Sequence, residues 1–404
     1  MNILVLTHRP LYPPVYGYSR VITDTYMAIA DKGHRVCIVS IVPKKKVGQK
    51  NLDGLDYIEL NEPLKVFLKL AITRTLLRLG KGEFLFYHLL WLAKTYASQE
   101  VVENTIKIAR EHLGEPDVVV AETIYPGFLA EKVAEKLGVK HVVRIHNIEA
   151  QYISSLVKLL KKKAVKTIGL LEESVLKKAC KIYALSYNDF LTVKTLYGNI
   201  NAVYIPPILI SRTPMQEDVL EKIGIEKNNY YFYIASPHKP NIFFLKKILE
   251  CWIHIREHGY KLVIGGSISP IARKLLDKYT TKENNIVIAG LLSREEVTAI
   301  TKNAYVCIAP HHGHGVPIKL VEALQLGVPV ITTVNALNTL KGLKNKYNIY
   351  AIDNVNELCE AITLLMHDKE LYNKIKYGAV EFSKELDHDK LASLFINEIY
   401  QIIR

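Results

Sequence analysis

The amino-acid sequence predicts an α/β protein of two domains, each built on a parallel sheet with helices on both faces. Three observations carry this prediction. The chain has 404 residues, more than one hydrophobic core usually holds. Strand-like and helix-like segments alternate along it. The alternation stops at VYIPP (203–207), where two prolines follow a short strand, and then begins again. We therefore expect Rossmann-like αβα domains at 1–206 and 207–387, facing each other across a cleft.

In the first half, apolar β-rich runs are expected to form the buried strands of one sheet. These runs are 3–7, 36–42, 118–123, 141–146 and 181–186. Between them lie helical patterns, at 19–32, 101–113 and 126–137. A glycine follows each of these patterns, and glycine adopts at little cost the left-handed backbone that ends a helix.

The second half repeats the alternation with six strand-like runs. They are 230–236, 261–267, 285–290, 305–310, 328–333 and 348–353. A helix is expected after each of the first five. In sheets of this kind ligands bind beyond the carboxyl ends of the strands, so functional residues are expected in the loops at those ends.

Composition argues against several other classes of protein. Hydrophobic residues make up 49% and charged residues 23%, a globular rather than a disordered balance. The five cysteines are scattered and form no CxxC pair, so we expect reduced thiols, no disulfide framework and no zinc site. The start of the sequence has no basic segment followed by a long apolar one, and no apolar run reaches 18 residues. We expect a cytoplasmic protein without metal or cofactor.

The formal net charge of +13 favours polyanionic partners, although a solvated basic surface accounts for it equally well. Two segments concentrate the charge on apolar backgrounds, at 64–94 and 154–181. Each reads either as a helix on an anionic membrane surface or as a core helix with a basic outer face. The pair favours contact with the inner membrane face, and we do not expect nucleic acid as a partner.

Two strand-end loops in the first half carry candidate residues. In the loop 7–22, Gly17 precedes a helix start whose amides suit a phosphate, and Arg9 and Arg20 add positive charge. The segment RIHNIEAQY (144–152) places His146, Asn147 and Glu149 after a strand. A histidine there is a proton carrier, a partner for a sugar hydroxyl, or an ordinary residue of a helix start.

Two loops in the second half are similar. In IASPHKPNI (234–242), His238 and Lys239 stand on a stiff turn before a helix, which suits an anion or is ordinary turn chemistry. In HHGHGVPIKLVEAL (311–324), glycines precede a helix start, and Lys319 and Glu322 lie within the helix. Phosphate at the loop and a ribose diol at the carboxylate would describe a nucleotide, whereas a Lys319–Glu322 surface ion pair is the alternative.

The set of motifs resembles family-4 glycosyltransferases, retaining enzymes with the GT-B fold. Residues 313–333 (GHGVPIKLVEALQLGVPVITT) resemble that family's glycine loop and its helix pattern K-x-x-E-A-x-x-x-G-x-P-V-x-x-T. PPVYGY (13–18), the HNIE segment and SPHKPN (236–241) are similar to three further motifs of the family, in the same order. The resemblance covers nearly the whole chain and implies transfer of a sugar from a nucleoside diphosphate to a hydroxyl.

By this resemblance each candidate residue has an expected role. The catalytic residues would be His146, His238 and Lys239, with His146 at the transferred sugar. The donor would be bound by Gly17, Gly313, His314, Gly315, Val316, Lys319 and Glu322, with Glu322 at the ribose. The acceptor, a glycan or a lipid-linked molecule, would lie near Arg9, Tyr18, Arg20, Asn147 and Glu149. The resemblance also implies that the last helix, 388–404, completes the N-terminal acceptor-binding domain, and that 207–387 binds the nucleotide sugar.

The sequence departs from the family pattern in three places. His314 stands where many members have a glutamate, and Tyr18 where many have a second glycine. The usual Arg and Lys pair for the diphosphate is not evident, and Lys239, Lys246 and Lys247 are the candidates to replace it. Two alternatives stay open: a sugar-nucleotide epimerase using carboxylates such as Glu122 and Glu149, and a non-catalytic membrane- or nucleic-acid-binding protein on the same scaffold.

Overall fold

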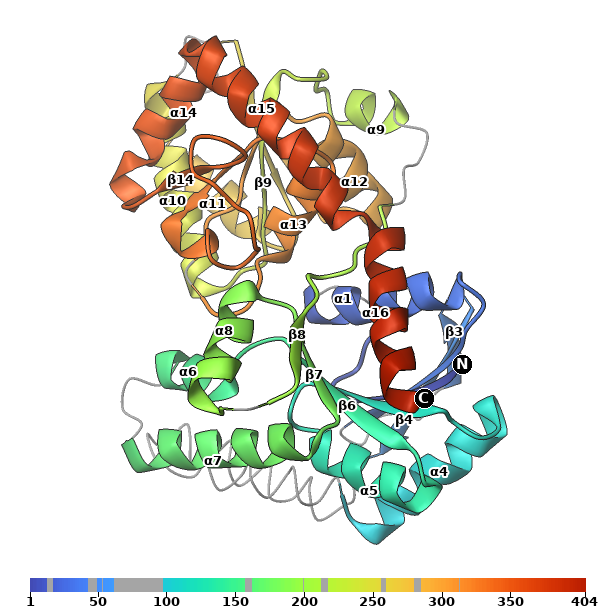
Figure 1. Ribbon diagram of the computed structural model, residues 1–404. Helices are drawn as coiled ribbons and strands as arrows, with labels where there is room; N and C mark the ends of the chain where they lie inside the picture. Colours follow the sequence, from blue (N-terminus) through green and yellow to red (C-terminus); the bar gives the residue numbers. More distant parts are fainter. Residues whose placement is uncertain are drawn as a thin grey trace. The chain divides into compact units, whose positions relative to one another are not determined.

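The computed structural model describes most of the chain as two compact units (Figure 1). Unit 1 comprises Met1–Leu209 with His388–Arg404, and unit 2 comprises Ile210–Asp387. The described residues are 1–12, 17–42, 49–52, 54–61, 97–156, 162–198, 200–211, 217–255, 259–279, 285–311 and 313–404. The basic segment 64–94 lies outside them, and 154–181 lies partly outside. No helix in these ranges is long and apolar enough to span a membrane.

Unit 1 contains an eight-stranded sheet in the order β3-β4-β2-β1-β5-β6-β7-β8. Its strands are β1 Asn2–Thr7, β2 Arg35–Val42, β3 Gln49–Leu52, β4 Leu55–Asn61, β5 Val118–Glu122, β6 Lys140–Ile145, β7 Lys181–Ala184 and β8 Ala202–Tyr204. All neighbours pair in parallel except β3, which is antiparallel to β4 at the edge. The strands predicted in this half are confirmed, whereas β3 and β4 were not predicted.

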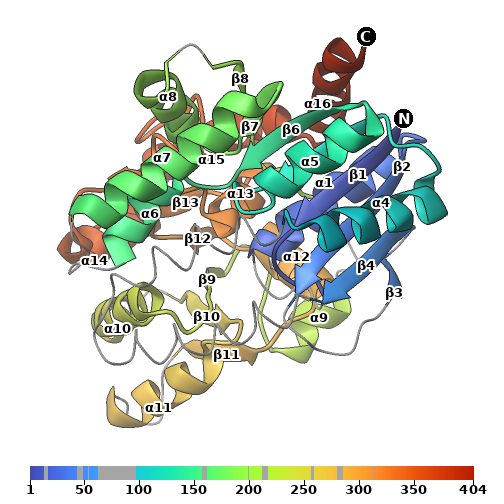
Figure 2. The same cartoon turned by 90° about the horizontal axis from the view of Figure 1, so that it is seen from below.

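Helices cover both faces of this sheet. They are α1 Gly17–Ala30, α4 Gln99–Leu113, α5 Gly127–Leu137, α6 Glu149–Leu156, α7 Lys162–Lys178, α8 Tyr187–Leu196 and α16 His388–Ile403. Figure 2 shows α4, α5 and α7 on the near face, while α16 packs against α1. The glycine stop is confirmed at Gly138, which has φ of 70° and donates its N–H to carbonyls of the last turn of α5.

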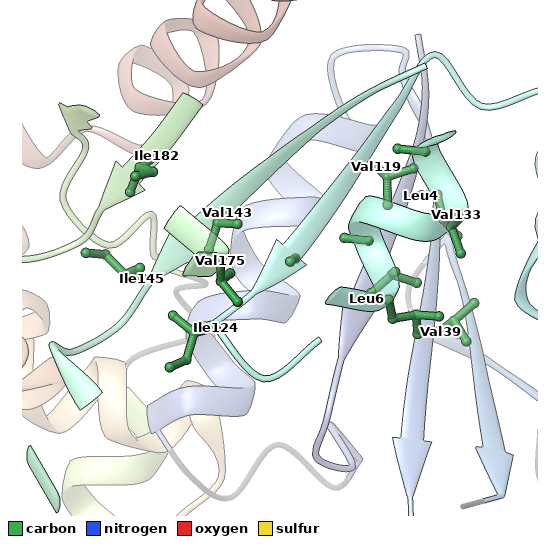
Figure 3. Packing of buried hydrophobic residues seen from close by; sticks show 14 of the residues in the cluster. Leu4, Leu6, Val39, Val119, Ile124, Val133, Val143, Ile145, Val175 and Ile182 are labelled. Carbon is green, nitrogen blue, oxygen red and sulfur yellow. The ribbon is translucent and has the colours of Figure 1, made fainter. Parts of the chain in front are cut away.

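The core of unit 1 lies between its sheet and the helices α4, α5 and α7. Leu4 and Leu6 of β1 point to this side, together with Val119 of β5 and Val143 of β6, and all four are fully buried (Figure 3). Val133 of α5 and neighbouring helix residues pack onto them. Because the other face is covered as well, the strands are apolar at nearly every position, the expected pattern for a parallel sheet.

Unit 2 contains a six-stranded parallel sheet in the order β11-β10-β9-β12-β13-β14. Its strands are β9 Tyr230–Ile234, β10 Lys261–Gly265, β11 Ile286–Gly290, β12 Val306–Ile308, β13 Val330–Thr333 and β14 Tyr350–Ile352. All six predicted strands are confirmed. The helices are α9 Glu217–Lys222, α10 Lys239–His254, α11 Ser269–Tyr279, α12 Arg294–Lys302, α13 Ile318–Gln325, α14 Leu358–His367 and α15 Lys369–Ser383.

The prediction of a helix after residues 328–333 was wrong. A single 3₁₀ turn, Val334–Ala336, follows β13, and a loop runs from there to β14. The segment is rich in residues whose side chains bind nearby backbone, as when the Thr339 hydroxyl donates to the Ala336 carbonyl at 2.7 Å. Such contacts compete with helix hydrogen bonds, and the segment has no apolar periodicity that would favour a helix.

The expectation of reduced cysteines was also wrong for one pair. Cys251 of α10 and Cys359 of α14 form a disulfide across 108 residues of sequence, with Cα atoms 5.0 Å apart. The two helices pack on the same side of the unit 2 sheet, which brings together two positions that no short spacing connects. The remaining cysteines, Cys37, Cys180 and Cys307, are free.

Candidate functional site

Each sheet has a point where the strand order reverses, and the candidate residues gather at these points. In unit 1 the reversal lies between β1 and β5. The chain extends the sheet from β1 through β2 to β4 and β3 in one direction, and from β5 through β6 and β7 to β8 in the other. In unit 2 the same reversal occurs between β9 and β12. Crevices beyond the carboxyl ends of such strand pairs are where open α/β sheets bind ligands.

In unit 2, a glycine loop leads from β12 to the start of α13. Gly315 has φ of 75°, a left-handed backbone that a residue with a side chain adopts only under strain. Pro317 is the N-cap of α13 and offers no side-chain cap, so the first amides of the helix point out of it without a side-chain acceptor. Burial lowers the pKa of His314, which is therefore neutral at pH 7. Amides and helix dipole make this loop suitable for an anion.

Lys319, in the first turn of α13, has a buried ammonium group. Its Nζ has no hydrogen-bond partner among the described residues and lies 5.0 Å from the centre of the Tyr233 ring. Burial lowers the pKa of Lys319 to about 8. The ion pair with Glu322 that the sequence left open is not formed, because Nζ finds no acceptor among the side chains that the structure describes, Glu322 included. A buried cation without a partner is costly, and an anionic ligand would remove that cost.

Glu322 lies one turn further along α13. Its neighbours Val321 and Ala323 are buried, and its carboxylate is near enough to Cys307 of β12 to raise the pKa of that thiol, after burial itself. The carboxylate therefore lies close to β12, a central strand of the sheet. A carboxylate in this place can accept hydrogen bonds from both hydroxyls of a diol.

The loop after β9 presents His238 and Lys239 to solvent at the start of α10. His238 is the N-cap and Lys239 the first residue of the helix. The turn is held by Asn241, whose side-chain amide donates to the Ser236 carbonyl at 2.9 Å and whose carbonyl accepts the Tyr233 hydroxyl at 2.8 Å. Asn241 thus has a structural role, and the side chains of His238 and Lys239 remain exposed at this edge.

In unit 1, Glu122 at the end of β5 is fully buried and accepts three hydrogen bonds. Oε1 accepts from the Tyr26 hydroxyl and from Nη1 of Arg144, each at 2.5 Å. Oε2 lies 2.7 Å from Nε2 of His146. Burial acts to raise the pKa of Glu122, but Arg144 and the hydrogen bonds from His146 and Tyr26 outweigh it and lower the pKa to about 2. Burial lowers the pKa of His146.

An aromatic cluster lies beside this network at the ends of β1 and β5. The His8 ring is 4.6 Å from that of Tyr125, and the Tyr18 ring is 4.9 Å from that of His146. The Tyr18 hydroxyl is 2.6 Å from Oγ1 of Thr7. Tyr18, which replaces the usual second glycine, is thus part of the packed edge.

Thr123 reinforces the cluster with an unusual backbone. It has φ of 76°, which is strained for a β-branched residue, and its hydroxyl lies 3.2 Å from Nδ1 of His8. Strain of this kind persists only where the surroundings hold it, and it is common next to functional sites.

The remaining first-half candidates differ in how they are placed. Gly17 is exposed at the first position of α1, and Arg9 is exposed with its guanidinium 5.6 Å from the Tyr18 ring centre. Arg20 pairs with Asp24 at 3.6 Å. Glu149 is buried, where it accepts from the Tyr125 hydroxyl at 2.8 Å, so its carboxylate belongs to an internal network. Asn147 is partly buried.

Several residues at the unit 1 edge were missed or undervalued from sequence: His8, Thr123, Tyr125 and Arg144. Thr123 is the last residue of the predicted strand 118–123, as His146 is of 141–146, so the strand-end rule that found His146 would have found it too. Arg144 lies within a strand and faces inward, and nothing in the sequence indicates its partner.

Comparison with known proteins identifies a matching family and proteins of similar fold. Residues 230–368 match a family described as glycosyl transferases group 1. No curated protein matches the sequence. Sucrose-phosphate synthase from Thermosynechococcus elongatus is similar in structure, with a TM-score of 0.69 and 13% identity over 99% of this chain and 98% of that one.

Two further structures are similar over almost their whole length. HepE of Anabaena, in complex with UDP and glucose, has a TM-score of 0.66 and 12% identity over 99% of this chain and 100% of that one. A glycosyltransferase from Rickettsia africae has a TM-score of 0.66 and 16% identity over 100% of this chain and 98% of that one. At such identities the likeness concerns the fold.

Proposed function

We propose that this chain moves a sugar from a nucleoside diphosphate to a hydroxyl acceptor. It is a group 1 glycosyltransferase with the GT-B fold, matched to that family over residues 230–368. The observation that carries the proposal is the buried ammonium of Lys319 at the start of α13, which has no hydrogen-bond partner in the part of the chain that the structure describes. It lies next to the glycine loop at the reversal point of the unit 2 sheet, where an anionic ligand is expected.

The nucleotide part of the donor would occupy the carboxyl edge of unit 2. The diphosphate would accept hydrogen bonds from Lys319 and from the amides of Gly315 and Val316. His238 and Lys239 would add further hydrogen-bond donors at the same edge. The carboxylate of Glu322 would hold the ribose diol. Negative charge grows on the diphosphate as it leaves, and preformed donors of this kind stabilise it.

The acceptor would be bound by unit 1, near the edge formed by Arg9, Tyr18 and His146. In the transfer, the acceptor oxygen forms a bond to the anomeric carbon while the bond from that carbon to the diphosphate oxygen breaks. We propose retention of configuration, with the acceptor attacking from the side of the departing diphosphate. The hydroxyl proton then passes to that diphosphate oxygen.

The finer expectations from sequence remain part of this proposal. They are a hexosyl donor, an acceptor that is a glycan or lipid-linked molecule, and peripheral contact with the inner membrane face through the basic segments. The exposed lysines of α7, Lys177 and Lys178, are compatible with such contact, and each also pairs with a nearby glutamate. The epimerase alternative is weakened at one of its candidates, because Glu122 is fully buried and its carboxylate already accepts three hydrogen bonds from protein side chains.

The test is binding of nucleoside diphosphates and their sugars to the whole protein, measured by calorimetry across a panel of bases. We expect one base to bind, and Lys319→Ala to weaken it at least tenfold. Lys274→Ala, which removes an exposed lysine of α11, is the matched control and leaves binding unchanged. If no nucleotide of the panel binds, the proposal is overturned. Release of nucleoside diphosphate only when a lipid or glycan acceptor is added separates a transferase from an epimerase.

A further inference from the structure

The contact between Glu122 and His146 has a defined direction. An ionised carboxylate can only accept hydrogen bonds, so the 2.7 Å contact requires a hydrogen on Nε2 of His146. If the imidazole is neutral, its other nitrogen, Nδ1, then carries a lone pair. Nδ1 has no hydrogen-bond partner among the described residues, and the side chain is 10% exposed, beside the Tyr18 ring.

The surroundings of Glu122 keep it ionised without also making His146 cationic. Arg144 contributes the neutralising positive charge and is itself held by the Thr25 hydroxyl at 3.1 Å. Its guanidinium lies 5.7 Å from the Tyr26 ring centre and 5.2 Å from that of Phe395 in α16. The pair Glu122–Arg144 is therefore electrically balanced, and burial lowers the pKa of His146 so that the ring is neutral at pH 7.

The two carboxylate oxygens of Glu122 have separate partners. Oε1 receives the Tyr26 hydroxyl and Arg144, whereas Oε2 receives only His146 among the described residues. Because the carboxylate is clamped at Oε1, Oε2 cannot turn away from the imidazole. This arrangement determines both the ring orientation and the position of its single proton, as carboxylates do for histidines in other polar sites.

We propose that Glu122 is a positioning residue that holds His146 as the neutral Nε2–H tautomer, so that Nδ1 accepts a hydrogen bond from a hydroxyl of the transferred sugar. The inference rests on the proposed function for the identity of the ligand, but not for the tautomer. It makes His146 a hydrogen-bond acceptor in the site. It excludes a role for His146 as the acid that protonates the leaving diphosphate.

The tautomer can be measured without substrate. In protein labelled with ¹⁵N-histidine, the signals of His146 are assigned by their loss in His146→Asn, and their shifts report the proton on each ring nitrogen. We expect a neutral ring at pH 7 with the proton on Nε2. A proton on Nδ1, or a doubly protonated ring at pH 7, overturns the proposal whether or not the chain is an active transferase.

Two substitutions at His146 distinguish the contributions of its two ring nitrogens to activity. His146→Gln keeps a donor in the place of Nε2 and loses the acceptor in the place of Nδ1, whereas His146→Asn keeps a polar atom near Nδ1 and loses the contact with Glu122. We expect the Gln variant to lose about 100-fold in kcat/KM and the Asn variant less, with binding of the nucleoside diphosphate alone unchanged in both. A greater loss in the Asn variant contradicts the role of Nδ1.

The positioning role of Glu122 has its own test. In Glu122→Gln the side-chain amide can donate to Nε2, which moves the imidazole proton to Nδ1. We expect the ¹⁵N signals to show that change, and kcat to fall while the affinity for the nucleoside diphosphate is retained. If the variant folds and the tautomer stays as in the wild type, Glu122 does not set it. If the variant fails to fold, the tautomer measured in the wild type and the activities of the two His146 variants decide whether the proposal holds.

Discussion

The ammonium nitrogen of Lys319 lies 5.0 Å from the centre of the Tyr233 ring, and among the described residues it has no hydrogen-bond acceptor. Stability and ligand binding therefore make opposite demands on this side chain. Lys319→Met keeps the length of the side chain and removes its charge. We expect this variant without ligand to be more stable than the wild type, by about 1 kcal/mol or more, because no isolated charge is buried. We expect nucleotide affinity to fall at least tenfold. Thermal unfolding and calorimetry check the two changes, and a variant that loses both stability and binding would indicate a purely structural lysine.

The same lysine predicts a pH dependence. Its pKa falls from 10.5 to about 8 on folding, so the folded state releases a proton more easily than the unfolded state. The cost of burying the charge is fully present below pH 8 and disappears as pH rises from 8 to 10.5. The wild type should thus gain stability relative to Lys319→Met over that interval, measured by denaturant unfolding. Affinity for a diphosphate should decline over the same interval, because only the protonated side chain attracts it.

Glu322 is expected to act on the ribose. Glu322→Ala should weaken binding of the preferred nucleoside diphosphate by about 10- to 100-fold, which corresponds to loss of one or two hydrogen bonds to a charged group. The 2′,3′-dideoxy form of that nucleotide, which lacks both ribose hydroxyls, is the matched control ligand. It should bind the wild type as weakly as the natural nucleotide binds the variant, and the substitution should make little further difference to it. Independent, additive losses in calorimetry would show that the carboxylate does not contact the diol.

The Cys251–Cys359 disulfide should stabilise unit 2. It closes a loop of 108 residues, and the chain-entropy account gives about 4.7 kcal/mol for a loop near 100 residues. Reduction, or the double substitution to serine, should lower the unfolding temperature of unit 2. Cys180→Ser serves as the control, because that cysteine is free. Nucleotide affinity at 25 °C should be unchanged, since the disulfide joins α10 and α14 and contacts neither Lys319 nor Glu322. An unfolding curve indifferent to reductant would contradict this prediction.

A buried acid in unit 1 should make stability fall as pH rises. Burial, with Glu172 and Glu149 adding repulsion, raises the pKa of Asp189 from 3.8 to about 7, and its Oδ2 has no partner among the described residues. The contribution of Asp189 to folding is therefore most favourable below about pH 4, and it is lost as pH rises from 4 to 7. Asp189→Asn should stabilise the protein at pH 8 by on the order of 2 kcal/mol, and should do much less at pH 4. Equal effects at both pH values would rule out ionisation as the cause.

The sequence predicted the central strands of both sheets, because buried parallel strands are apolar at almost every position. It missed β3 and β4 at the edge, where one side is polar and the run QKNL has no apolar pattern. A hairpin signal was present there in LDGL (52–55), since Asp-Gly between two short runs is typical of a tight turn between antiparallel strands. Local patterns were thus sufficient for the centre of the fold and weaker at its margin.

For the candidate site, the strand-end rule located His146, His238 and the loop before α13. It could not predict that Glu122 would accept from His146, because the other donors to Glu122 come from α1 and β6. The disulfide escaped prediction for the same reason, since its two cysteines meet only after α10 and α14 have packed. Spacing in sequence identifies residues that share a loop or helix face, whereas these contacts depend on the whole tertiary arrangement.

The place of α16 has a consequence for the order in which the protein folds during synthesis. Phe395 of this helix is buried against Arg144 and packs edge-on against Tyr183, and Lys181 pairs with Glu398 at 2.6 Å. Unit 2 is complete in sequence at Asp387, before the ribosome has made Phe395 or Glu398. The unit that is encoded first is therefore the last to have its whole chain available. Until α16 emerges, the nascent unit 1 lacks the helix whose Phe395 covers Arg144 and Tyr183.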